Sequence, residues 1–208
     1  GAAPGVSFFP ARPPGDRPAP AGDEARHLTS VMRAKVGDEV VLFDGSGTEF
    51  AARITSLYKH AVELTILERR EVSRVLAFEL TLAVALPKGE RQKWLVEKIT
   101  EPGVTRLVPL LTERGVAQPT EAALDRLQRA VIEASKQCGR NRLMEIGEPS
   151  TASEFFAQAS AETIRIVADP SGESLAAQPS FAAWSTATPM IAAVGPEGGF
   201  APEEVRSA

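Results

Sequence analysis

The residues best suited to bind a ligand are the glycine-rich run Gly195-Pro196-Glu197-Gly198-Gly199, which follows the apolar segment 190–194. Glycines let a loop approach a ligand closely and offer backbone N–H donors, and α/β folds bind ligands at the carboxyl ends of their strands. Residues 201–204 resemble a helix start with two acidic residues in the first turn, which disfavours a phosphate there. The expected ligand is therefore neutral or cationic at this loop. An ordinary strand-to-helix turn explains the same pattern equally well.

Cationic and amide side chains form a second candidate site within residues 120–142. Helical spacing over residues 120–138 places Arg126, Arg129 and Lys136 opposite an apolar face. The run Gln137-Cys138-Gly139-Arg140-Asn141-Arg142 follows, and its guanidinium and amide groups suit phosphates and base edges. Acidic residues dilute this face, so a solvated helix surface is the alternative.

Other kinds of catalytic site find little support in the sequence. Cys138 falls on the apolar face of the same helix with no His or Asn partner in view, which predicts a small core residue. One cysteine and the two histidines, His27 and His60, argue against a metal centre. We find no P-loop, no GxGxxG and no Ser-His-Asp arrangement.

Alternating strands and helices must position these candidates in the second half of the chain. Apolar runs predict strands at residues 80–86, 105–111, 163–168 and 190–194, and helical spacing predicts helices at 90–101, 120–138 and 155–159. This alternation is typical of a largely parallel sheet covered on both faces.

The first half is expected to be mostly β-structure. Strands at 40–43 and 49–54 flank the turn residues Asp44-Gly45-Ser46-Gly47 as a hairpin, a third strand covers 61–67, and a helix covers 26–35. These elements predict a small barrel. We place the domain boundary near residues 70–78, so that 1–74 forms one domain and 75–208 the other.

Composition limits the class of protein. The 208 residues are 43% hydrophobic and 24% charged, which is typical of a globular protein. No apolar run is long enough to cross a membrane and no secretory signal is evident, so a cytoplasmic protein is expected. The net charge of −4 argues against generic binding to nucleic acid. Residues 86–142 nevertheless carry 11 Lys and Arg against 7 Asp and Glu, which fits either a local anion-binding surface or ordinary charge segregation.

Several segments, taken in order, resemble one known family. They are His27-Leu28, Arg33, Lys35-Val36-Gly37-Asp38, Phe43-Asp44-Gly45-x-Gly47-x-Glu49, Leu86-Pro87-Lys88-Gly89, Glu97-Lys98-Ile99-Thr100-Glu101-x-Gly103-Val104, Pro109, Glu113-Arg114, Glu133-Ala134, Gln137-Cys138-Gly139-Arg140-Asn141 and Gly195-Pro196-Glu197-Gly198-Gly199-Phe200. Together they resemble the RsmE-type 16S ribosomal RNA uridine N3-methyltransferases of the SPOUT superfamily, from about residue 26 to the end.

The resemblance implies a PUA-like barrel followed by a SPOUT α/β domain with a C-terminal trefoil knot, a feature otherwise nearly absent from proteins. It implies a homodimer without metal that uses S-adenosylmethionine to methylate N3 of a uridine in 16S ribosomal RNA or the small subunit. The residues expected to bind the cofactor are Gly195, Pro196, Glu197, Gly198, Gly199, Asp169 and Pro170. Those expected to bind RNA are Arg33, Lys88, Arg91, Arg114, Arg126, Arg129, Gln137, Arg140, Asn141 and Arg142. No residue is assigned as the acceptor of the N3 proton.

Two departures from the family pattern bear on these expectations. Pro102 stands where the family usually has Leu, which should shorten the preceding helix. The family also continues beyond the position of Ala208 with a segment that closes the knot and supplies a third cofactor loop, so the knot is expected to be incomplete in this chain.

Two alternative functions stay open at this point. A PUA-like barrel joined to a degenerate second domain would be a non-catalytic RNA-binding protein, which the intact glycine-rich loop disfavours. A SPOUT methyltransferase acting on transfer RNA is the other alternative. The Leu86-Pro87-Lys88-Gly89 and Gln137-Cys138-Gly139-Arg140-Asn141 stretches favour the ribosomal family instead.

Overall fold

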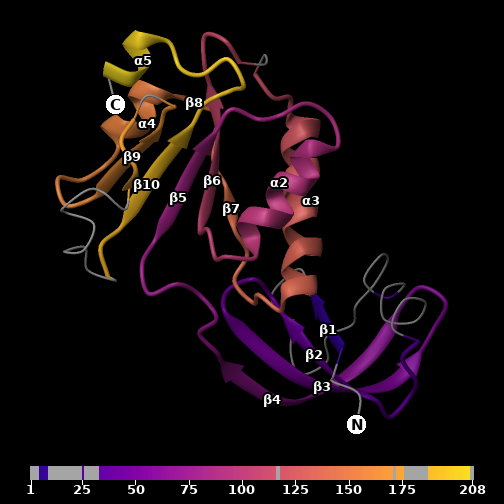
Figure 1. Ribbon diagram of the computed structural model, residues 1–208. Helices are drawn as coiled ribbons and strands as arrows, with labels where there is room; N and C mark the ends of the chain where they lie inside the picture. The colour runs from indigo at the N-terminus through magenta and orange to yellow at the C-terminus, as the bar shows by residue number, and fades with distance from the viewer. Residues whose placement is uncertain are drawn as a thin grey trace. The chain divides into compact units, whose positions relative to one another are not determined.

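The computed structural model describes residues 5–8, 25, 33–115, 118–170, 172–175 and 187–206. The chain divides into two compact units, the first made of Gly1–Arg74 with Ser135–Leu143 and the second of Val75–Ala134 with Met144–Ala208. Figure 1 labels the elements of both. Ser135–Leu143 belongs to the first unit although it lies between two segments of the second. A single boundary along the sequence therefore does not separate the two units.

The described part of the first unit contains a four-stranded sheet of order β1-β2-β3-β4. Its strands are β1 (Gly5–Phe8), β2 (Glu39–Phe43), β3 (Thr48–Leu57) and β4 (Val62–Glu71). β1 runs parallel to β2, whereas the other pairs are antiparallel. The expected hairpin and third strand are confirmed, but β4 extends through Glu71 and past the predicted end at residue 67.

Alternation along these strands builds a core on one side of the sheet. The buried residues that pack together are Val40, Leu42, Ala52, Ile54, Val62 and Leu64, with Ala25. Most of the helix predicted over 26–35 lies outside the described residues. Its last three residues, 33–35, are not helical, because Arg33 has φ +51° and Lys35 N–H donates to Asp38 Oδ2 at 2.8 Å in a turn.

Ser135–Leu143 is held in the first unit by hydrogen bonds to the β2–β3 turn and its surroundings. Leu143 N–H donates to Gly45 O at 3.1 Å, and Gly47 N–H donates to Asn141 O at 3.2 Å. The Asn141 amide donates to Val72 O at 2.8 Å and to Glu49 Oε1 at 2.9 Å, which lie 69 and 92 positions away in sequence. Glu49 in turn accepts from Arg74 Nε at 2.7 Å. This network therefore joins distant segments of the chain.

The second unit contains a six-stranded sheet of order β7-β6-β5-β10-β9, with β8 also paired to β6. Its strands are β5 (Leu80–Val84), β6 (Arg106–Leu111), β7 (Glu145–Ile146), β8 (Ser150–Thr151), β9 (Ile164–Ala168) and β10 (Met190–Val194). All of these pairs are parallel, as the alternation of elements predicts. The chain places β10 between β5 and β9, so that the glycine-rich loop follows an interior strand of the sheet and not an edge strand (Figure 1).

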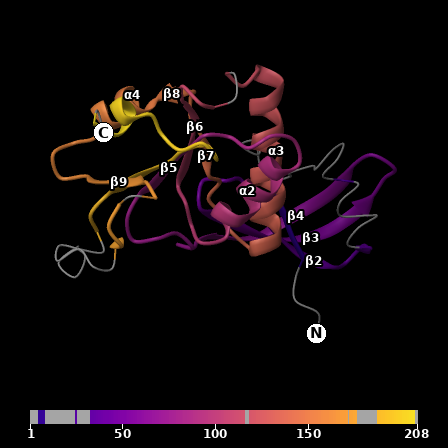
Figure 2. The same cartoon turned by 45° about the horizontal axis from the view of Figure 1, so that its top comes forward.

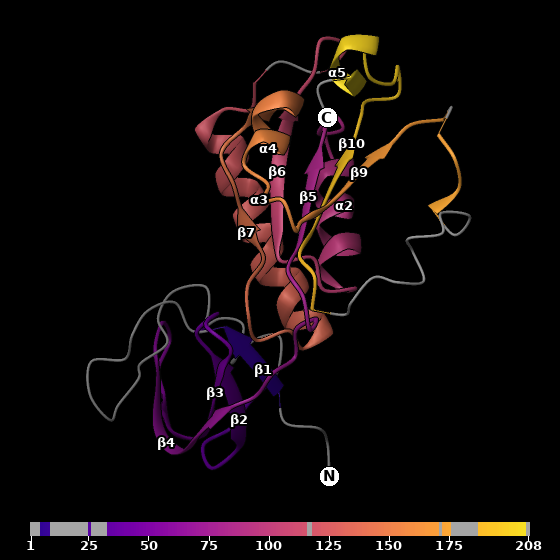
Figure 3. The ribbon, with the colours of Figure 1, turned by 90° about the vertical axis from the view of Figure 1, so that its left-hand side faces the viewer.

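Helices cover both faces of this sheet. α2 (Arg91–Thr100) and α4 (Ala152–Ala157) lie on opposite sides of the strands in Figure 3, and Figure 2 shows the long helix α3 (Glu121–Cys138) next to α2. Phe155 and Phe156 of α4 pack with Phe200 on a row of small residues, Ala83, Val108 and Ala193, that are in register across three strands. Thr120 begins α3 as predicted, because its Oγ1 accepts from Ala123 N–H at 3.3 Å. No helix in the described part of the chain is long and apolar enough to span a membrane.

The fourth helix begins three residues earlier than the predicted 155–159 because Thr151 and Glu154 form a capping box. Glu154 Oε2 accepts from Thr151 N–H at 2.9 Å and from its hydroxyl at 2.8 Å. These backbone and side-chain hydrogen bonds lower the pKa of Glu154 below its ordinary value of 4.5. The local signal was the Thr-x-x-Glu spacing, which marks a helix N-terminus.

A pH dependence of α4 follows from this lowered pKa. The stabilisation is present above the ordinary pKa of 4.5 and is lost as pH falls through the lower folded pKa. We expect the backbone amides of Phe155 and Phe156 to lose hydrogen-exchange protection in that acidic window. Glu154→Gln should remove this pH dependence while preserving a capping box. Protection that falls equally in both proteins would show that another group controls α4.

Candidate active site

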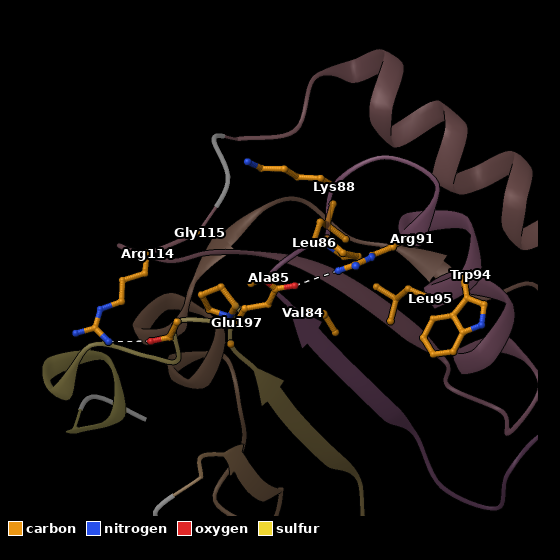
Figure 4. Close-up of a pocket in the computed structure, with 14 residues that line it drawn as sticks. Val84, Ala85, Leu86, Lys88, Arg91, Trp94, Leu95, Arg114, Gly115 and Glu197 are labelled. Atoms are coloured by element: carbon orange, nitrogen blue, oxygen red, sulfur yellow. Dashed lines mark hydrogen bonds and ion pairs between the residues drawn. The ribbon is translucent and has the colours of Figure 1, made fainter.

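A pocket of about 1150 Å³ lies in the second unit at the carboxyl ends of β5 and β10. Three segments line it, namely the end of β5 with the loop into α2, the residues after β6, and the loop after β10 (Figure 4). The lining residues are Val84, Ala85, Leu86, Pro87, Lys88, Arg91, Trp94, Leu95, Arg114, Gly115, Gly195, Pro196, Glu197 and Gly198. Parallel pairing of β5 and β10 brings the first and last of these segments together, since Val84 and Val194 are in register.

The conformation of the loop after β10 depends on its glycines. Gly199 has φ +67° and its N–H donates to Pro196 O at 2.8 Å, which closes a tight turn. A Cβ atom at Gly195 would lie 3.1 Å from the buried ring of Phe200, closer than most Cβ contacts. Glycine at these two positions therefore lets the chain turn sharply at the end of the strand and leaves the loop backbone facing the pocket.

Two of the charged side chains lining the pocket pair across it. Arg91 Nη1 donates to Glu197 Oε1 at 3.0 Å, which joins the first turn of α2 to the glycine-rich loop (Figure 4). Both side chains are largely exposed, at 74% and 94%, so this ion pair adds little to folding stability. Either group can therefore exchange its partner for a polar ligand at small cost.

Arg114 and Glu204 hold the glycine-rich loop from the other side. Arg114 Nη1 donates to Gly198 O at 2.8 Å. Glu204, in the short helix α5 (Pro202–Arg206), accepts from Glu113 N–H at 3.1 Å and from Ala201 N–H at 2.7 Å. A side chain of the segment after β6 thus bonds to the backbone after β10, and a side chain of the segment after β10 bonds to the backbone after β6.

An apolar wall, which the residue pattern alone did not indicate, completes the pocket. Leu86 and Leu95 line it together with Trp94, a residue that is 61% exposed. Ligand pockets are lined mostly by apolar and aromatic side chains, which these three residues supply. Trp94 lies three positions after Arg91 on α2, and this helical spacing next to Leu86-Pro87-Lys88-Gly89 was the signal that could have found it.

Only some of the residues expected to bind the cofactor line the pocket. Gly195, Pro196, Glu197 and Gly198 line the pocket, whereas Gly199 sets the turn of the loop behind them. Asp169 and Pro170 follow β9, at the carboxyl end of the strand next to β10, and are not among the lining residues. Their role in cofactor binding stays a prediction.

The residues expected to bind RNA fall into three groups. Lys88, Arg91 and Arg114 line the pocket of the second unit. Arg126 and Arg129 are exposed on α3, and Arg33, Gln137 and Arg142 are exposed in the first unit. Arg140 and Asn141 are instead buried, at 5% and 2% exposure.

Burial changes the interpretation of Arg140 and Asn141. Arg140 Nε donates to Arg142 O at 2.7 Å, and burial lowers the pKa of its guanidinium. The amide nitrogen of Asn141 donates to Val72 O and to Glu49 Oε1. Both side chains therefore bond to the protein's own backbone or carboxylate, and the expected contacts of these two residues with RNA stay a prediction.

Cys138 is also placed differently from its prediction. It was expected on the apolar face of its helix, but it is exposed in the last turn of α3, with Sγ 3.8 Å from Ser135 O. The residues of that helix that become buried are Ala123, Leu127, Ala130, Val131, Ala134 and Ser135. Within the described residues, no three His, Cys, Asp or Glu side chains are grouped as ligands for a metal ion.

Comparison with known families matches both halves of the chain. Residues 74–208 match the model of a family described as an RNA methyltransferase domain, and residues 20–67 match one described as an RNA methyltransferase PUA domain. These matches confirm the predicted PUA-like first domain followed by an α/β methyltransferase domain. The C-terminal knot stays a prediction.

Individual proteins give the same result. The chain is 31% identical over 185 residues to ribosomal RNA small subunit methyltransferase E of Synechocystis sp., covering 88% of this chain and 60% of that protein's length. It is 30% identical over 196 residues to the protein of the same name from Mycobacterium bovis, covering 88% and 72%.

Solved structures extend the likeness to the fold. The enzyme of that name from Neisseria gonorrhoeae, solved bound to S-adenosyl methionine, superposes with a TM-score of 0.87 at 26% identity, covering 99% of this chain and 85% of that one. A Legionella pneumophila protein solved with the bound cofactor SAM gives 0.86 at 27% identity, with the same coverage. Together with the family matches, these relationships show that the chain belongs to the RNA methyltransferase family of ribosomal RNA small subunit methyltransferase E type.

Proposed function

We propose that this protein transfers a methyl group from S-adenosylmethionine to N3 of a uridine in 16S ribosomal RNA. The observation that carries the proposal is the pocket at the carboxyl ends of β5 and β10, bordered by the glycine-rich loop. Related proteins of known fold are described with S-adenosyl methionine bound. When bound, this cofactor supplies an electrophilic methyl group on a sulfonium.

The residues present fit such a cofactor. Ligand pockets for molecules of this size measure about 300–1,000 Å³, and the pocket here is of that order at about 1150 Å³. Leu86 and Leu95 offer apolar surface for a nucleobase, and the backbone of Gly195 and Gly198 permits close approach. Glu197 offers a carboxylate that suits ammonium or hydroxyl groups, and no phosphate has to be accommodated beside α5.

Chemistry at uridine N3 places two demands on the chain. The base must be held so that N3 faces the methyl group, and the N3 proton must leave as the new bond forms. Lys88 and Arg91, which line the pocket, are suited to attract the RNA backbone towards it. The proton acceptor stays unassigned among the described residues.

A methyl-transfer assay tests this proposal. Purified full-length protein, labelled S-adenosylmethionine and 16S ribosomal RNA, free or in small subunits, should yield label in 3-methyluridine after digestion and mass spectrometry. Transfer RNA is the control substrate. Label in transfer RNA would favour a SPOUT methyltransferase of the transfer RNA class. Cofactor-independent RNA binding without transfer would favour the non-catalytic alternative.

Exposed arginines of α3 provide a test of the RNA surface. Removing one phosphate contact should lower the slope of log affinity against log salt by about one unit or less. We expect this from Arg126→Ala and Arg129→Ala, measured by RNA titration between about 50 and 200 mM salt. Arg53→Ala is a control on the first unit, where the guanidinium pairs with Glu39 at 2.7 Å. Unchanged slopes for both α3 variants would place the RNA elsewhere.

Three features implied by the family resemblance complete the proposal. We expect a homodimer, which sedimentation velocity of the full-length protein measures directly. We expect activity that withstands a chelator, because no metal takes part in the proposed transfer. We also expect the protein in the cytoplasm, where its proposed ribosomal RNA substrate is made.

A further inference from the structure

Arg114 is exposed, and its side chain lies along the glycine-rich loop. Its Nη1 donates to Gly198 O at 2.8 Å (Figure 4). Its aliphatic part passes beside the same residue, because a Cβ atom at Gly198 would lie 3.6 Å from Arg114 Cδ and 3.8 Å from Arg114 Cβ. The side chain therefore runs along the loop, with its charged end bonded to the loop backbone and its stem beside Gly198.

Glu204 provides a second connection between the same two segments. One carboxylate oxygen accepts from Glu113 N–H at 3.1 Å, and the other accepts from Ala201 N–H at 2.7 Å. Glu113 and Arg114 are neighbours after β6, and Ala201 and Gly198 flank the turn at Gly199. Two adjacent residues after β6 are thus hydrogen-bonded to two residues after β10, Glu113 to Glu204 and Arg114 to Gly198.

We infer that Arg114 and Glu204 are positioning residues that hold the glycine-rich loop in the conformation that binds the cofactor. This inference rests on the proposed function. A loop with three glycines in five residues loses much conformational freedom when a ligand orders it, and that loss reduces affinity. Holding the loop beforehand removes part of the cost, so these two side chains raise cofactor affinity without touching the reacting atoms. The role differs from the RNA contact expected for Arg114.

Calorimetric titration of the full-length protein with S-adenosylmethionine tests the inference. Arg114→Ala should raise the Kd about fivefold to tenfold, because the variant cannot form the charged hydrogen bond to the loop. Arg114→Lys should restore most of the affinity, since a lysine can still donate to Gly198 O. Glu204→Gln should weaken binding less than Glu204→Ala, because the amide keeps one of the two acceptors. The double alanine variant should show a smaller loss than the product of the single effects, since both side chains hold one pair of segments.

Controls separate this role from the alternatives. Arg165→Ala is the matched control, because that exposed arginine also donates to one backbone carbonyl, Ala159 O at 3.2 Å, but lies outside the pocket. Its cofactor Kd should not change. An Arg114→Ala variant with unchanged Kd and an RNA salt slope lower by about one unit would overturn the inference and restore the RNA contact. A wild-type protein that binds no S-adenosylmethionine would instead refute the proposed function itself. If Arg114→Ala fails to fold, the Arg114→Lys and Glu204→Gln pair decides on the same readouts.

Discussion

Replacing Gly198 with valine is expected to weaken binding of S-adenosylmethionine at least tenfold while the protein stays folded. A Cβ atom at this position meets only Arg114, at an ordinary 3.6 Å, so the chain itself accepts the side chain. Gly198 lines the pocket, and the added isopropyl group would occupy space that a ligand on the loop backbone would use. Calorimetric titration and a thermal melt of the same sample measure the two effects separately.

Two further glycine variants separate blocked space from backbone strain. Gly199→Val places a β-branched residue at φ +67°, so both the melting temperature and the affinity should fall. Gly37→Val places one at φ +96° in open space of the first unit, so only the melting temperature should fall. Affinity of Gly198→Val equal to that of wild type would show that the cofactor does not contact this loop.

Replacing Asn141 with leucine is expected to destabilise the first unit strongly. Asn141 is 2% exposed, and its amide donates to Val72 O at 2.8 Å and Glu49 Oε1 at 2.9 Å. Without the amide, the Val72 carbonyl and the largely buried Glu49 carboxylate each lose one hydrogen-bond donor. Such losses cost about 2–3 kcal/mol, which corresponds to a decrease in melting temperature of about 5–10 °C for a chain of this size. Scanning calorimetry of the full-length protein gives the measurement.

The same chain segment supplies the control for Asn141. Gln137 carries the same kind of amide but is exposed, so Gln137→Leu should change stability by no more than about 0.5 kcal/mol. A base-reading role for Asn141 predicts a different pattern, in which RNA affinity falls while the melting temperature stays constant. That pattern would contradict the structural role assigned to this residue.

Local patterns in the sequence were sufficient to predict most elements of the second unit. The apolar runs at β5, β6, β9 and β10 and the helical spacing of α2 and α3 all became the elements expected. Each signal is carried by residues close together in the chain, since a buried strand or an amphipathic helix needs only its own periodicity. The position of the glycine-rich loop followed for the same reason, because the loop directly succeeds an apolar strand.

Tertiary structure alone decided which polar side chains are buried in the fold and which line the pocket. Arg140, Asn141 and Arg114 are alike in sequence terms, as polar residues within a basic stretch. The first two are buried, Asn141 against partners 69 and 92 residues away, and Arg114 bonds to a carbonyl 84 residues away. Burial and partners of this kind depend on which distant segments pack together, which no local periodicity encodes. Cys138 departs from its expected environment for the same reason. The segments that pack on α3 bury its residues only as far as Ser135, although the apolar pattern of the sequence continues to Cys138.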